Sequence, residues 1–115
     1  MESLWKEPKI SSIVETLQQV SIRPGMYIGE VNLNAMYSFL GTYRSGIYEA
    51  MTSLGRHKHE ELMQQIIYDR GLPEIRSFHT ILLERGTPES EVIKTMIEVE
   101  IQTWIRFEND LEKIA

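Results

Sequence analysis

One interruption, Arg23-Pro24-Gly25-Met26-Tyr27-Ile28-Gly29, divides a sequence whose pattern is otherwise helical. Pro24 fixes its own φ and disfavours helical geometry at the preceding residue, so a helix that arrives from upstream is expected to end there. Pro-Gly is also a common turn sequence, because glycine adopts positive φ without strain. Residues 26–28 are therefore predicted to form a short extended segment that ends at Gly29. We call residues 23–29 the joint, since the flanking helices are expected to fold about it.

Amphipathic helices are predicted on both sides of the joint. Upstream, residues 9–21 carry apolar side chains at the spacing of one buried helical face, with Pro8 near the first turn. Downstream, Asn32 or Asn34 is a suitable N-cap for a second helix, which is expected to reach Leu54 and to stop at Gly55.

The basic run at residues 56–59 is predicted to lie in a connecting loop at the start of the third helix. His57 and His59 could begin a metal site, but the spacing supplies no third ligand, so charge on the protein surface is the preferred interpretation. The third helix is expected to continue to about Arg70 and to end at Gly71.

Two more helices are predicted in the remaining sequence. A short fourth helix should run from about Glu74 to Arg85. Gly86 ends it, Thr87 caps the next helix and Pro88 occupies the first helical position. This last helix should reach about Lys113, which makes it the longest. The predicted fold class is all-α, a single domain over residues 1–115 with about five helices.

The composition restricts the class of protein further. The chain has 115 residues, an ordinary apolar fraction of 42% and no cysteine, so one core and no disulfide framework are expected. The first residues show no secretory signal, and no apolar run approaches the length that crosses a bilayer. The sequence indicates a soluble, cytoplasmic protein without a membrane partner.

Charge is distributed unevenly along the chain. Residues 1–58 contain 6 Lys and Arg against 5 Asp and Glu, whereas residues 59–115 contain 6 against 12, within a net charge of −5. Nucleic-acid binding relies on clustered Lys and Arg, so an acidic half argues against a nucleic-acid partner. Acidic surface instead favours a basic protein partner.

The joint resembles a segment near the start of the ATPase domain of the DNA gyrase B subunit and its topoisomerase relatives. In that family the segment precedes a helix with a catalytic glutamate and a magnesium-binding asparagine. Here the following helix contains Glu49 without an Asp-Asn pair, and no later Asp-x-Gly-x-Gly loop is present. Nucleotide hydrolysis by this chain is not expected.

A second resemblance covers more of the chain. Small bacterial immunity proteins against contact-dependent growth-inhibition toxins are of similar size and carry Arg-Pro-Gly-Met-Tyr-(Ile/Leu)-Gly, a short capped turn and a Phe-Leu-containing helix. Residues 23–29, 30–33 and 39–41 match this pattern. The resemblance implies an antitoxin that binds a cognate toxin domain, expected to be a basic nuclease, and blocks its active site or substrate groove. It transfers no residue-level binding motif.

Two classes of function remain open from the residues. No nucleophile–base pair, metal-ligand cluster or phosphate-binding loop follows from the spacing, so neither an enzyme nor a cofactor is expected. His79 lies among apolar residues and is expected to be a hydrogen-bonded core histidine. A toxin-binding immunity protein is the first choice, and a non-catalytic regulatory or accessory module, related to the gyrase-type segment, is the alternative.

Partner-binding residues are predicted on one face of the last helix. Two isoleucines alternate there with acids, which suits an interface that recognises basic residues around an apolar anchor. The alternative is that this face packs partly on another helix and the acids border it. The residues are Glu98, Ile101, Ile105, Glu108 and Glu112, with Tyr27 and Glu30 of the joint region as further candidates.

Two charges occupy places where the helical pattern expects apolar residues. Glu100 lies within one turn of Met96, Ile97 and Trp104, and Arg44 has the equivalent place on the second helix. A buried charge needs a partner of opposite sign. We therefore predict that Arg44 and Glu100 form a buried structural pair, with a tyrosine hydroxyl or His79 completing the hydrogen bonds.

Overall fold

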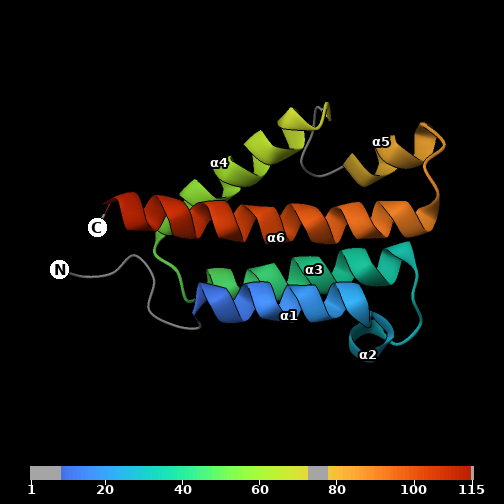
Figure 1. Ribbon diagram of the computed structural model, residues 1–115, viewed down its shortest axis with the longest axis horizontal. Coiled ribbons are helices and arrows are strands. Elements are labelled where there is room, and N and C mark those ends of the chain that lie inside the picture. The colour runs from blue at the N-terminus through green and yellow to red at the C-terminus, as the bar shows by residue number, and fades with distance from the viewer. Residues whose placement is uncertain (1–8, 73–77, 115) are drawn as a thin grey trace.

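The computed structural model describes residues 9–72 and 78–114, with side chains up to residue 111, and every element in these ranges is a helix (Figure 1). The predicted all-α class is confirmed, with six helices in the described residues instead of about five. They are α1 (Ile10–Ile22), α2 (Gly25–Ile28), α3 (Leu33–Tyr48), α4 (Ser53–Asp69), α5 (Phe78–Glu84) and α6 (Glu89–Ile114).

The long helix α6 is the axis of the molecule. Figure 1 shows α4 and α5 along one side of α6, and α1 and α3 along the other. The α6 side chains Trp104 and Phe107 are fully buried, as are Leu17 of α1 and Ile67 of α4. Fully burying one such side chain contributes about 1.5–3 kcal/mol, so these contacts hold the helices on their common axis.

The joint is helical, and the prediction of an extended segment over residues 26–28 is wrong. Pro24 has φ −59° and ψ −34°, and its carbonyl accepts a hydrogen bond from the Ile28 N–H at 3.1 Å. The fixed φ of proline suits the first turn of a helix, where its missing N–H is not needed. Pro24 therefore starts the single turn α2, which Gly29 ends with φ 71°.

The second predicted helix corresponds to α3, which ends six residues before the predicted Leu54, and the third corresponds to α4. α3 ends at Tyr48, and α4 begins at Ser53 after a short turn. Thr52 caps α4, because its side chain accepts a hydrogen bond from the Gly55 N–H at 3.0 Å. The predicted end at Leu54 and Gly55 is therefore wrong, and residues 56–59 lie within α4 and not in a loop.

The other boundaries agree closely with the sequence pattern. α1 begins and ends one residue later than predicted, and Asn32 caps α3 by accepting from the Ala35 N–H at 2.8 Å. Gly71 and Gly86 adopt positive φ just after α4 and α5. α6 begins at Glu89 and ends at Ile114. The expected start of the fourth helix at Glu74, and Pro8 before α1, lie outside the described residues.

Candidate functional site

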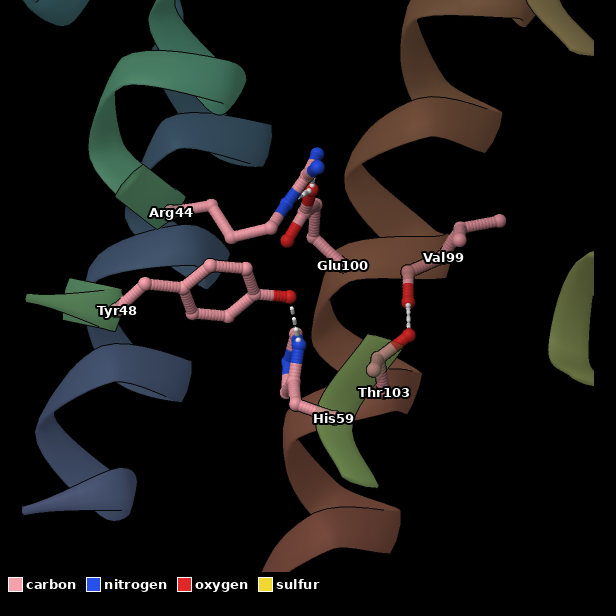
Figure 2. A network of polar contacts seen from close by, with 6 residues as sticks. All are labelled: Arg44, Tyr48, His59, Val99, Glu100 and Thr103. Carbon is pink, nitrogen blue, oxygen red and sulfur yellow. Dashed lines mark hydrogen bonds and ion pairs between the residues drawn. The ribbon is translucent and has the colours of Figure 1, made fainter. Parts of the chain in front are cut away.

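Arg44 of α3 and Glu100 of α6 meet in the interior, where the helical pattern places them. The Arg44 Nε donates to Oε1 of Glu100 at 2.8 Å, and Nη2 of the same guanidinium donates to the same oxygen (Figure 2). The exposed fraction of the side chain is 5% for Glu100 and 29% for Arg44. The carboxylate is thus enclosed, whereas part of the guanidinium reaches the surface.

The pKa of each group in the pair is shifted by burial and by the charge of its partner. Burial raises the pKa of Glu100, and the charge and hydrogen bonds of Arg44 only partly offset that effect. Burial is the largest influence on Arg44 and alone would lower its pKa. The charge of Glu100 and its hydrogen bond, together with smaller effects of Tyr48 and Tyr37, outweigh burial, so the pKa of Arg44 is raised. The ionised form of Glu100 therefore depends on Arg44.

Among the described residues, neither a tyrosine hydroxyl nor His79 forms a hydrogen bond with the Arg44–Glu100 pair. Tyr48, one turn after Arg44 on α3, directs its hydroxyl at Nδ1 of His59, at 2.6 Å (Figure 2). His79 is only half-buried, and its ring lies 4.7 Å from that of Tyr37, between centroids. The predictions that a tyrosine or His79 completes the pair, and that His79 is a core histidine, are therefore wrong.

The core histidine is His59, for which the sequence indicated surface charge. Its side chain is fully buried, and its ring packs against that of Trp104, tilted by 38° with the centroids 3.9 Å apart. Burial lowers its pKa to about 3, so the imidazole is neutral at physiological pH. Its Nε2 is buried without a hydrogen-bond partner in the described structure. His57 is exposed beside Glu61, as expected for surface charge.

A pocket of about 490 Å³ opens beside the Arg44–Glu100 pair, and we call it the Arg44 pocket. Its walls come from α3, α4, α5 and α6. Arg44, Arg56 and Glu60 provide its charged side, while Leu40, Met63 and Met96 provide apolar surface. The volume lies within the range of small-molecule sites in proteins.

The predicted face of α6 is only partly available to a partner. Ile105 is 42% exposed, whereas Ile101 packs partly against the core. The Glu98 carboxylate already lies 3.7 Å from the Arg70 guanidinium of α4. Glu108 is half-buried, and the side chain of Glu112 lies outside the described residues. The partner-binding role of this face stays a prediction.

An exposed apolar surface lies at the joint and beside it. We call it the joint surface, and its members have exposed fractions of 68% for Ile22, 75% for Met26, 40% for Tyr27 and 49% for Val31. Val31 lies against α2, because a methyl group added to Gly25 would come within 3.9 Å of it. From this region, the sequence pattern indicates only Tyr27 and Glu30, which is exposed, as partner-binding residues.

A groove of about 440 Å³ adjoins the joint surface. It is lined by Pro24 and Val31 on one side and by Glu89, Ile93 and Lys94 of α6 on the other. The Glu89 carboxylate also accepts a hydrogen bond from the Leu33 N–H at 2.7 Å, which fixes the start of α3 against the start of α6. The groove is therefore held by the framework of the bundle.

A comparison with protein-family models, with curated proteins and with solved structures finds no match. Within residues 9–72 and 78–114, no group of three or more His, Cys, Asp and Glu side chains is placed to hold a metal ion. None of the described helices combines the length and the apolar character needed to cross a membrane.

Proposed function

We propose that this chain is an immunity protein, which binds a cognate bacterial toxin domain through the joint surface and neutralises it. The observation that carries the proposal is the exposure of four large apolar side chains on and beside the joint. Exposed apolar side chains gathered in one region of a surface are typical of protein-binding sites. The joint is also the segment that resembles the immunity proteins, so one region supports the proposal in two ways.

Charge supports a basic toxin as the partner, and we expect a nuclease. Exposed Glu30 follows the joint, and Glu89 of the acidic half of the chain lines the adjoining groove beside Lys94. A nuclease needs Lys and Arg near its substrate groove to bind phosphates. An apolar anchor bordered by carboxylates would occupy such a groove, and attraction between opposite charges would speed the encounter.

The test uses the protein encoded immediately upstream of this chain, where we expect the toxin. The two proteins are co-purified, their affinity is measured by calorimetry, and the protection of cells that express the toxin is scored. Ile22→Ser combined with Met26→Ser should weaken binding by about 100-fold, because central apolar anchors carry most of the energy of an interface. Circular dichroism should show an unchanged fold, since both side chains are exposed.

Control variants test whether binding depends on the joint surface or on another surface of the chain. Leu54→Ser combined with Tyr68→Ser removes two equally exposed apolar side chains, 66% and 63%, from α4, and should leave the affinity unchanged. Reversal of Glu98, Glu108 and Glu112 to Lys tests the predicted α6 face. Loss of binding in that variant alone would move the interface to α6. No complex with the toxin and no protection of cells would reject the immunity function.

A further inference from the structure

We propose that the Arg44 pocket binds a small amphipathic carboxylate, a monoanion with an apolar body. This inference rests on the geometry of the pocket and does not depend on the proposed immunity function. The charged side of the pocket would hold the carboxylate of the ligand, and the apolar side would hold its hydrocarbon part.

The Arg44 guanidinium is partly exposed and lines the pocket. Glu100 is only 5% exposed, so it neutralises Arg44 from behind, while 29% of the Arg44 side chain is exposed. Its hydrogen bonds to Glu100 use two of the five N–H donors of a guanidinium. The remaining donors suit a planar acceptor, and a carboxylate accepts from a guanidinium through two parallel hydrogen bonds.

Arg56 places a second cation in the same pocket. Its guanidinium lies 5.2 Å from the centroid of the Tyr48 ring, which also lines the pocket. Its partner Glu60 is 3.5 Å away and both side chains are about half exposed, so this ion pair is weak and can rearrange. The carboxylates of Glu60 and Glu100 would repel a ligand with two negative charges, which favours a monoanion over a phosphate.

The apolar side of the pocket determines the rest of the ligand. Leu40, Met63 and Met96 are at least 96% buried and line the pocket together with Phe78 and Val99. Methionine side chains adapt to ligands of different shape. A flexible hydrocarbon chain or an aromatic ring would therefore be accepted, and each buried methylene should tighten binding about fourfold.

The probe for the test is sodium octanoate. Titration of the isotope-labelled protein should produce saturable shifts in the NMR signals of Ser45 and Gln64, which line the pocket. Hexanoate should bind more weakly than octanoate, while octylamine and inorganic phosphate should cause no saturable shift at these residues. Absence of saturation below the micelle concentration of octanoate, or equal binding of octylamine, would overturn the proposal.

Substitutions inside and outside the Arg44 pocket test whether octanoate binds there. Arg56→Gln changes an exposed side chain, so it should keep the fold and weaken octanoate binding at least threefold. The double variant Arg44→Met with Glu100→Leu removes the first cation without leaving a buried charge, and should weaken binding at least tenfold. Arg70→Gln, which changes a cation outside the pocket, is the control and should bind as the parent does. Wild-type affinity in both pocket variants would overturn the proposal.

Discussion

A carboxylate enclosed among apolar side chains needs its counter-ion, and Glu100 depends on Arg44 in this way. Arg44→Met would leave the Glu100 charge buried without compensation, so we expect it to lower the free energy of unfolding by about 3–5 kcal/mol. Glu100→Leu should cost less, because the partly exposed Arg44 can turn its guanidinium to water. The double variant should recover much of the loss. Chemical denaturation of the four proteins measures these differences.

Equal losses in the two single variants would contradict this account. That result would mean that the guanidinium cannot reach water once Glu100 is removed. No loss in either variant would show that the ion pair is not part of the folded core.

His59 should make the stability depend on pH. The folded chain protonates this imidazole only near pH 3, whereas the unfolded chain does so near 6.5. Below pH 6.5 the unfolded state takes up the proton first, so the contribution of His59 to stability falls by about 1.4 kcal/mol per pH unit. The raised pKa of Glu100 acts in the opposite sense in acid. The effect is therefore measured as a difference between variants.

Unfolding free energies at pH 7 and pH 5 provide that difference. His59→Gln should be less stable than the parent at pH 7, and it should lose less stability between the two pH values. His57→Gln, which changes an exposed histidine, is the matched control. A pH dependence in His59→Gln equal to that of the parent would show that folding does not lower the pKa of His59.

Among the elements, the turn between α3 and α4 depends on one hydroxyl group. Thr52 caps α4 through the Gly55 N–H, so Thr52→Ala should lower the free energy of unfolding by about 1 kcal/mol. Ser53→Ala, at the next exposed position, is the control and should change little. Thermal unfolding followed by circular dichroism makes the comparison. A Thr52→Ala protein as stable as the parent would mean that packing alone separates the two helices.

The same turn shows where apolar spacing fails as a guide to helix ends. Ile47, Met51 and Leu54 continue the spacing of one helical face, so the pattern predicts a single helix across residues that form a turn. The capping hydrogen bond of Thr52 starts a new helix at this point, so the continuous helix that the apolar spacing predicts does not form. At the joint, proline is compatible both with ending one helix and with starting the next, and sequence alone does not distinguish the two.

Individual charges were easier to place than individual histidines. Arg44 and Glu100 stand out because each interrupts an apolar stripe, which requires a partner across the core. His59 lies in a run of charged residues that suggests solvent. Its spacing of three, four and seven residues before Leu62, Met63 and Ile66 was the available signal for burial. The joint surface required the structure, since its exposure depends on how α1, α2 and α3 pack against one another.

At the scale of the whole molecule, the shared axis predicts a single cooperative unfolding transition. Trp104 of α6 is fully buried, so its fluorescence reports on the core, while circular dichroism reports on all helices. The chain has two tryptophans, Trp5 and Trp104, and Trp5 lies outside the described residues. A Trp5→Phe variant retains Trp104 as its single tryptophan. The two signals should then change at the same denaturant concentration. Separate midpoints would show that part of the bundle folds without α6.

The place of α6 in the order of the chain also has a consequence for biosynthesis. The helices that pack on α6 are all translated before it. Their apolar faces therefore have no α6 to pack against when they leave the ribosome. The 26 residues of α6 take about 1–5 s to add at ~5–20 residues per second. During that interval the nascent chain exposes the side chains of its future core, and a chaperone that holds apolar segments would have its opportunity to bind.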